Sequence, residues 1–353
     1  MGLAAKESGF RIAVLDPTED SPCGQIADYK IVAAYDDEAA LAELAKMSDV
    51  ITYEFENIDY EGLKRLGEIA NVPQGAELVR ITQNRMNEKA EIKASGAPVA
   101  NYITAHTFEE LTEKIEQVGF PCIVKTAFGG YDGKGQIKLD SIEQLEEAKP
   151  LFDHSTCIAE AFVPFMKEIS VIVQRGVGGQ SYCLPIAENI HKDHILHESI
   201  VPARIDAEVA KKAIEAAGQI ANHLELVGTL AVEMFVLEDG NIVINELAPR
   251  PHNSGHYSIE ACNVSQFHQH VRAVCGWPLR EPKLWAPSIM VNVLGEHVEP
   301  LEKAMNDYPD WSVHLYGKAE AKEKRKMGHV TIMTDDLEKT LAEIEASNVW
   351  FNK

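Results

Sequence analysis

A glycine-rich loop between two short apolar segments is the feature that most restricts how this 353-residue chain can fold. Residues 122–126 and 136–139 are predicted strands, and the loop over 128–136 holds four glycines. Glycines let backbone N–H groups approach an anion closely, and Lys134 adds a positive charge. The loop does not match the Walker or G-x-G-x-x-G patterns, since a strand follows it. A phosphate clamp and a plain hairpin turn both remain open, and Lys125 on the preceding strand favours the clamp.

A second predicted hairpin brings two carboxylates together. Asp239-Gly240 between apolar segments is typical of a two-residue β-turn. With these residues as the loop, Glu233 pairs with Glu246, and directly opposed side chains share one face of the hairpin. The two carboxylates repel each other unless a cation or a proton lies between them, and Mg²⁺ prefers carboxylate and phosphate oxygens. We therefore predict a magnesium site there, the alternative being two solvated glutamates on an exposed face.

A polar loop follows this hairpin. Pro249 and Pro251 exclude a helix. The loop is crowded with the polar residues Arg250, His252, Asn253, Ser254 and His256. An arginine beside so many hydrogen-bonding groups favours an anion site over a purely structural loop.

Composition and charge exclude several classes of protein. The chain has 55 acidic and 33 basic residues, a net charge of −22, which disfavours general binding to DNA, RNA or anionic membranes. No segment has the roughly 18 consecutive apolar residues of a membrane span, and the first residues lack a signal-peptide pattern. The six cysteines are scattered without a C-x-x-C pair, which is typical of reduced thiols. We expect a cytoplasmic protein with no nucleic-acid or membrane partner.

Strands and helices alternate in the first part of the chain. Strands are predicted over 10–15 and 50–55, and helices over 2–8, 37–47 and 60–70. This alternation predicts a parallel sheet covered by helices. Farther along, helices are predicted over 107–118, from about 141 and over 207–224, and strands over 169–174, 181–187, 229–237 and 241–247.

Seven stretches together resemble the ATP-grasp ligases, and among these the N5-carboxyaminoimidazole ribonucleotide synthetases. They cover nearly the whole chain: LDPTEDSPCGQIAD, DVITYEFENI, TQNRMNEK, VKTAFGGYDGKGQ, SIVPAR, NELAPRPHNSGHYSIEAC, and YGK with RKMGH. The resemblance implies an α/β chain, α+β in its ATP-grasp part. It implies an incomplete Rossmann-like N-terminal domain over 1–84, an ATP-grasp domain over 85–276 and a small C-terminal domain over 277–353.

The resemblance also implies an activity. It is the ATP-dependent carboxylation of 5-aminoimidazole ribonucleotide by bicarbonate in purine biosynthesis, through carboxyphosphate. ATP and Mg²⁺ are the implied cofactors, and a homodimer is the implied assembly. The implied catalytic residues are Lys125, Glu246 and Arg250, and the implied metal ligands are Glu233 and Glu246, which agrees with the hairpin pairing.

The implied binding residues fall into two sets. The ATP-binding set is Arg85, Lys125, Gly130, Tyr131, Asp132, Gly133, Lys134, Gly135, Gln136, Glu160, Ala161, Phe162, Val163, Glu168, His191, Asn245 and Glu246. The ribonucleotide-binding set is Glu54, Arg250, His252, Asn253, Lys318, Arg325 and Lys326. The basic residues of the second set would bind the 5′-phosphate.

The first residues depart from the family pattern. Family members begin with a strand and a G-G-G-Q-L-G-type turn, whereas this sequence begins at Met1-Gly2-Leu3, inside the helix that follows. We expect a gene that encodes about two dozen more residues. Intact mass of the protein from its native locus tests this.

Three rival functions are compatible with the sequence. His191, His194 and His197 are spaced to lie on one helix face and could bind a transition metal, although their flanks resemble strand and loop. An ATP-grasp ligase with a different amine acceptor is the second, and a nucleotide-binding protein without catalysis is the third. A nicotinamide dehydrogenase is disfavoured, because no G-x-G-x-x-G follows a predicted strand.

Overall fold

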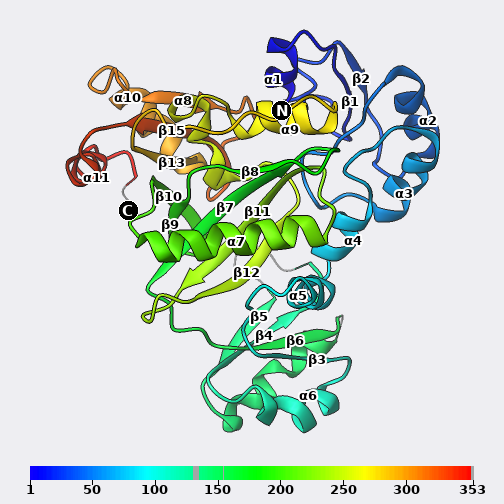
Figure 1. Ribbon diagram of the computed structural model, residues 1–353, viewed down its shortest axis with the longest axis vertical. Coiled ribbons are helices and arrows are strands. Elements are labelled where there is room, and N and C mark those ends of the chain that lie inside the picture. Colours follow the sequence, from blue (N-terminus) through cyan, green and yellow to red (C-terminus); the bar gives the residue numbers. More distant parts are fainter. Residues whose placement is uncertain (130–134, 154, 351–353) are drawn as a thin grey trace.

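The computed structural model describes residues 1–129, 135–153 and 155–350, and the strands within them form three sheets (Figure 1). The strands of the largest are β7 (Lys167–Arg175), β8 (Ser181–Cys183), β9 (Ala187–Lys192), β10 (Ile195–Val201), β11 (Gly228–Val236), β12 (Ile242–Ala248), β13 (Ser288–Leu294), β14 (Ser312–Leu315) and β15 (Lys326–Met333). Their order is β12-β11-β7-β9-β10-β13-β15-β14, with β8 beside β7. Because β10 pairs with β13, the C-terminal strands continue the central sheet.

A smaller antiparallel sheet forms the lobe at the bottom of Figure 1. Its strands, in the order β3-β6-β4-β5, are β3 (Tyr102–Ala105), β6 (Cys157–Ala161), β4 (Cys122–Thr126) and β5 (Gln136–Leu139). Alternate residues of β4 point into the lobe, where Cys122 and Val124 pack with Leu111 of helix α6 (Phe108–Lys114). The strands predicted on both sides of the glycine-rich loop are therefore confirmed with their bounds.

The first part of the chain contains a short parallel pair, β1 (Ala13–Leu15) and β2 (Tyr29–Ile31). Its helices are α1 (Gly2–Glu7), α2 (Glu38–Met47), α3 (Tyr60–Ile69) and α4 (Glu77–Thr82). Asp37 and Asp59 cap α2 and α3 by accepting hydrogen bonds from backbone N–H groups. The strand predicted over 50–55 is wrong, because this irregular segment pairs with no strand among the described residues. Ile51 and Tyr53 are nevertheless buried in the local core.

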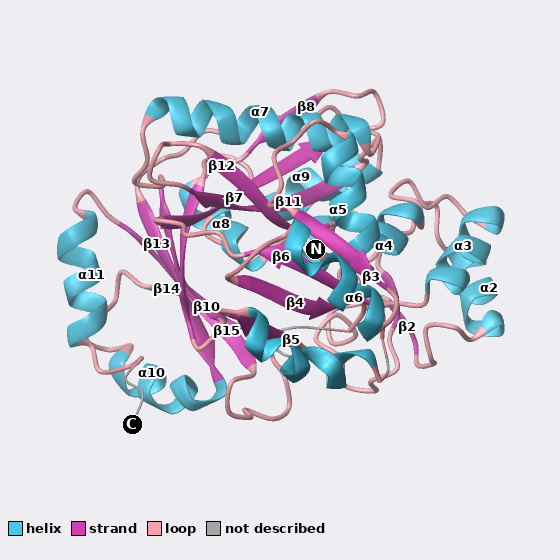
Figure 2. Cartoon of the chain, turned by 90° about the horizontal axis from the view of Figure 1, so that it is seen from below, coloured by secondary structure: helices cyan, strands magenta, loops and turns pink. Residues whose placement is uncertain are grey.

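Helices cover both sides of the large sheet. The remaining helices are α5 (Arg85–Ala94), α7 (Ala207–His223), α8 (Ser258–Ala261), α9 (Gln266–Val274), α10 (Val298–Ala304) and α11 (Leu337–Ala346), with 3-10 turns at Ile115–Gln117, Ile142–Phe152, Asn253–Gly255 and Gly295–His297. The helix predicted over 207–224 is confirmed by α7, whose apolar residues Val209, Ala213 and Ile220 pack against β7 and β11. Figure 2 shows α10 and α11 beside the strands that follow β10.

The segment predicted as a helix from about residue 141 is instead a 3-10 helix that contains Pro150, which has no N–H group to donate. Within the described residues, no helix combines the length and the apolar character that crossing a lipid bilayer requires.

Candidate active site

The predicted pairing of Glu233 with Glu246 across β11 and β12 is confirmed, although the predicted turn is wrong. The loop comprises residues 238–240, closed by a hydrogen bond from Leu237 N–H to the Asn241 carbonyl (2.9 Å). This longer loop alone would shift the register by one residue. A β-bulge in β12 between Ile244 and Glu246 restores the pair, because it adds one residue to that strand.

The carboxylate pair is electrostatically strained. Burial, together with the neighbouring charge of Glu246, raises the pKa of Glu233 to about 8. Burial and the same neighbour also raise the pKa of Glu88 on α5 to about 8. Oxygen ligands that repel one another in this way fit a divalent cation such as Mg²⁺, which prefers carboxylates and completes its shell with phosphates and water.

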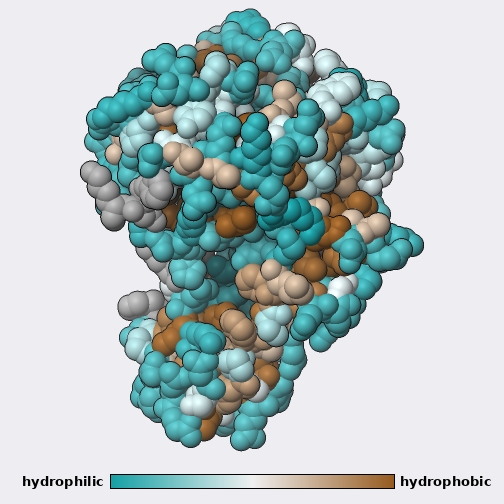
Figure 3. Space-filling model, turned by 90° about the vertical axis from the view of Figure 1, so that its left-hand side faces the viewer, coloured by the Kyte–Doolittle hydropathy of each residue, from teal (hydrophilic) through white to brown (hydrophobic). Residues whose placement is uncertain are grey.

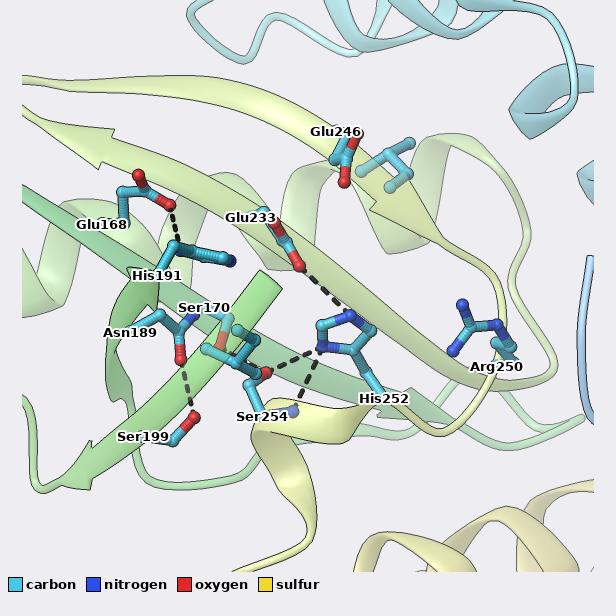
Figure 4. Close-up of polar contacts among 12 residues, drawn as sticks. Glu168, Ser170, Asn189, His191, Ser199, Glu233, Glu246, Arg250, His252 and Ser254 are labelled. Atoms are coloured by element: carbon cyan, nitrogen blue, oxygen red, sulfur yellow. Dashed lines mark hydrogen bonds and ion pairs between the residues drawn. The ribbon is translucent and has the colours of Figure 1, made fainter. Parts of the chain in front are cut away.

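A histidine fixes the orientation of Glu233. His252 Nε2 lies 3.1 Å from Glu233 Oε1 (Figure 4). The Ser254 N–H donates to His252 Nδ1 (3.3 Å), so the ring proton sits on Nε2 and is donated to Glu233. Burial, with Arg250 nearby, holds the pKa of His252 well below its usual value, and the ring is therefore neutral. The Ser254 hydroxyl accepts a hydrogen bond from Ser170 Oγ (2.7 Å).

A buried lysine–glutamate–lysine cluster lies across from the carboxylate pair. Glu160 on β6 forms ion pairs with Lys89 Nζ (2.9 Å) and Lys125 Nζ (3.1 Å). Burial would raise the pKa of Glu160, but the two lysines hold it below its usual value. Burial also lowers the pKa of Lys125, a shift that Glu160 opposes. Lys125 also lies near other positively charged groups, where it can bind an anion.

The lysine–glutamate–lysine cluster lines an open cleft between the small lobe and the large sheet. Figure 3 shows the molecule hollowed between its lower lobe and the rest. The cleft is lined by Lys89, Ala100, Ile123, Lys125, Glu160, Ala161, Phe162, Val163, Phe165, Phe235, Val243, Ile244 and Asn245. Charged groups at one end and aromatic and aliphatic side chains elsewhere suit a nucleotide.

Other residues of the implied ATP set lie near this cleft, since Asn245 lines both it and a smaller pocket that Glu168 and Glu233 line. Arg85 Nη1 is 3.5 Å from Glu246 Oε2. His191 Nδ1 is 2.8 Å from Glu168 Oε2 (Figure 4). Burial alone would lower the pKa of His191, but Glu168 raises it above its usual value.

The end of the glycine-rich loop adjoins Lys125. Gln136 pairs with Lys125 across β4 and β5, and the Gly135 carbonyl accepts a hydrogen bond from Thr126 N–H (2.9 Å). The remaining residues of the implied loop, Gly130, Tyr131, Asp132, Gly133 and Lys134, lie outside the described residues.

Arg250 extends the site toward the first part of the chain. Its guanidinium forms a two-point pair with Glu56, one bond being Nη2 to Oε1 at 3.0 Å. Burial would raise the pKa of Glu56, but Arg250 and, more weakly, Lys326 hold it below its usual value. Glu54 instead lies 3.1 Å from the Met1 amino group and is half-exposed. The structure therefore brings Glu56, rather than Glu54, to Arg250.

The other residues of the implied ribonucleotide set are not equally close to Arg250. Asn253 Nδ2 is buried without a hydrogen-bond partner among the described residues, which leaves a donor for a ligand. The positive charge of Lys326 contributes to lowering the pKa of both Glu233 and His252. Lys318 Nζ donates to the Lys326 carbonyl (2.6 Å), whereas Arg325 is exposed and donates to the carbonyl of Glu320.

The histidines considered for a transition metal lie on a hairpin, not a helix. His191 is on β9, His194 is in the turn with a positive φ, and His197 is on β10. His197 Nε2 contacts Lys192 Nζ (2.8 Å) instead of a shared site. Across the described ranges, no three or more His, Cys, Asp or Glu residues are grouped to hold a metal ion.

Sequence reasoning did not identify Glu56, Glu88, Lys89 or Ser170, whereas Ser254 was already named among the polar residues of the loop after β12. Glu88 and Lys89 belong to the TQNRMNEK stretch, whose match to the family was the available signal. Glu56 stands two positions after Glu54, and only the path of the irregular segment shows which carboxylate reaches Arg250.

Comparisons with known proteins agree over the whole chain. Family models match a ribonucleotide synthetase preATP-grasp domain over residues 1–83, an ATP-grasp domain over 90–267 and a phosphoribosylaminoimidazole carboxylase C-terminal domain over 288–343. The chain is 48% identical to the N5-carboxyaminoimidazole ribonucleotide synthase of Bacillus subtilis strain 168, over 100% of this chain and 92% of the relative. It is 44% identical to that of Staphylococcus aureus strain MRSA252, over 99% and 94% of the two chains.

Solved structures give the same result. The ADP complex of an N5-carboxyaminoimidazole ribonucleotide synthetase matches with a TM-score of 0.96 at 54% identity, over 99% of this chain and 93% of that one. The Aspergillus clavatus enzyme in complex with ADP and 5-aminoimidazole ribonucleotide matches with a TM-score of 0.90 at 31% identity, over 98% and 93%. These matches confirm the predicted fold class with its N-terminal, ATP-grasp and C-terminal parts. The chain therefore belongs to the N5-carboxyaminoimidazole ribonucleotide synthase family of ATP-grasp ligases.

Proposed function

We propose that this chain carboxylates the amino group of 5-aminoimidazole ribonucleotide, using ATP and bicarbonate. The single observation that supports this most strongly is the Glu233–Glu246 pair beside the cleft that Lys125 and Glu160 line, with Arg250 close enough to act electrostatically on both carboxylates. The relatives named above carry the same activity in their names, and the A. clavatus complex contains ADP and the ribonucleotide.

The nucleotide would occupy the cleft beneath the small lobe. Phe162, Val163 and Phe235 offer apolar contacts to the adenine, and the Phe165 and Phe235 rings stack with centroids 4.4 Å apart. Glu168 would bind the ribose. Arg85 and Lys125 would neutralise the phosphates, in the manner of preorganised charges at a phosphoryl-transfer site.

Glu233 and Glu246 would hold Mg²⁺, which supplies positive charge to the phosphoryl oxygens. Their repulsion and the raised pKa of Glu233 support this assignment. The neutral His252 keeps Glu233 oriented through its Nε2 proton.

The reaction needs an activated form of bicarbonate, which is a weak electrophile at neutral pH. A bicarbonate oxygen attacks the γ-phosphorus of ATP, ADP leaves, and carboxyphosphate forms. The amino nitrogen then attacks the carboxyl carbon, either of carboxyphosphate itself or of CO₂ released from it. A C–N bond forms, inorganic phosphate leaves, and the nitrogen loses a proton. Holding amine and intermediate together supplies the entropic part of the acceleration.

Arg250 and its neighbours would bind the ribonucleotide. Arg250 and Asn253, whose Nδ2 is unpartnered among the described residues, belong to the same loop, and Lys326 acts electrostatically on the groups around it. Lys318, Arg325 and Lys326 would meet the 5′-phosphate. A homodimer and a cytoplasmic location complete the proposal, supported by the family resemblance and by the reduced-thiol pattern of the cysteines.

The test measures ADP release with Mg²⁺, ATP and bicarbonate, with and without 5-aminoimidazole ribonucleotide. We expect release that depends on the ribonucleotide and a product that contains labelled bicarbonate carbon. ATP binding without stimulation by the ribonucleotide would contradict the proposal and favour another acceptor or a nucleotide-binding protein without catalysis.

Replacing Glu56 with glutamine is expected to raise the KM for the ribonucleotide about tenfold, because Arg250 loses its charge-assisted partner. The Kd for ADP should change less than about twofold, since Glu56 pairs outside the nucleotide cleft. Steady-state kinetics and calorimetry measure the two constants. The matched control is Glu61→Gln on the exposed face of α3, and equal ribonucleotide KM values in both variants would remove Glu56 from the site.

A further inference from the structure

β12 is the edge strand of the large sheet, and its outer polar groups are met by one isolated backbone bridge and by side chains instead of a further strand. The Ile244 N–H donates to the Pro98 carbonyl (2.8 Å). Next along the edge, Lys89 Nζ donates to the Asn245 carbonyl (2.7 Å), and the Leu247 N–H donates to Glu88 Oε1 (2.7 Å). Two consecutive side chains of α5 thus take the place of a neighbouring strand, and Figure 1 shows α5 beside β12.

These contacts flank the β-bulge. Ile242, Ile244 and Leu247 all point into the hydrophobic core beneath α7. Their spacing changes from two residues to three across the bulge, so two consecutive residues, Asn245 and Glu246, face away from that core. Asn245 lines the cleft and Glu246 meets Glu233. A regular strand could direct only one of the two toward the site, because successive side chains alternate between faces.

We propose that Glu88, assisted by Lys89, is a positioning residue that holds this bulge and thereby directs Asn245 and Glu246 into the nucleotide site. The inference rests on the proposed function for the identity of the ligand, but the bulge geometry is independent of it. Glu88 is buried, and its acceptor oxygen satisfies a backbone N–H on the outer edge of β12, where no further strand supplies a partner among the described residues. Leaving that N–H unpaired in the interior carries a free-energy cost, which a shift of β12 would relieve.

Three substitutions at one position separate the reach of the acceptor oxygen from the ionisable carboxyl group. Glu88→Gln keeps an oxygen at the same reach and removes the ionisable carboxyl. Glu88→Asp keeps a carboxylate and shortens it by one methylene group. Glu88→Leu removes the acceptor. The matched control is Glu91→Leu, one turn farther along α5, where the side chain pairs with His223 away from β12.

Two readouts test the proposal: the Kd for ADP by calorimetry, and hydrogen exchange of the segment 242–249 without nucleotide. Glu88→Gln and Glu91→Leu should match the wild type within about twofold in both readouts. Glu88→Asp and Glu88→Leu should weaken ADP binding about tenfold or more and accelerate exchange at Leu247. If Glu88→Leu does not fold, the comparison of the Asp and Gln variants decides.

Wild-type exchange and ADP affinity in Glu88→Asp would overturn the proposal. So would a Glu88→Gln variant as impaired as Glu88→Asp, since an acceptor oxygen at the original reach would then not be sufficient to hold the bulge. The hydrogen-exchange result is independent of turnover. A wild-type protein that shows no ribonucleotide-dependent ADP release would contradict the proposed function and leave the positioning role standing.

Discussion

Replacing Glu246 with glutamine is expected to lower ribonucleotide-dependent ADP release by about 10³-fold, at the upper end of what one electrostatic group contributes. Glu246 faces Glu233 across the hairpin and lies 3.5 Å from Arg85. The substitution keeps the size of the side chain but removes one of two negative charges that would hold Mg²⁺ at the phosphates. The Mg²⁺ concentration required for half-maximal rate should rise as well.

The matched control is Glu238→Gln, which changes an exposed glutamate in the loop of the same hairpin. Both variants should unfold at the same temperature within a few degrees. ADP release near the wild-type rate in Glu246→Gln would remove this residue from the metal and phosphate site.

Lys125→Ala should reduce ADP release by about 10²–10³-fold, because a preorganised charge is lost from the phosphate region. The Lys125 side chain is 13% exposed and shares Glu160 with Lys89. The variant should still fold, because Lys89 remains as a cationic partner for the buried Glu160. The Kd for ADP, measured by calorimetry, should also increase.

Lys149→Ala provides the control for this variant, since Lys149 is an exposed lysine of the same lobe. Its turnover and ADP affinity should be unchanged. Equal ADP affinity in Lys125→Ala and Lys149→Ala would show that Lys125 does not contact the nucleotide.

The β11–β12 hairpin shows which features the sequence pattern predicted and which it did not. Asp239-Gly240 correctly predicted the hairpin, and the apolar alternation correctly predicted its strands. The pairing of Glu233 with Glu246 was right only because two unpredicted features compensate: a longer loop and a bulge at Asn245. Side chains of α5, distant in the sequence, contact β12 on both sides of this bulge, and no local pattern in β12 indicated it.

Other differences have similar causes. The segment 50–55 has strand-like composition, but a strand also requires a neighbour with which to form hydrogen bonds. The buried Lys89–Glu160 pair joins residues 71 positions apart. Nothing in the sequence around either residue indicates that the two form an ion pair. The choice between Glu54 and Glu56 likewise depends on the path of an irregular segment. Elements with strong local signals, such as α7 and β4, were predicted with nearly correct bounds.

Because α5 contacts the outer edge of β12, it also determines where the chain can be cut to produce a shorter fragment. Unpaired strand edges recruit other chains and promote aggregation. A fragment that begins after Ala94 would lose Glu88 and Lys89 and present the outer edge of β12 to solvent. The β11–β12 hairpin would then become a site of edge-to-edge association. An excised ATP-binding unit should begin before Arg85, so that its first helix keeps that edge from polymerising.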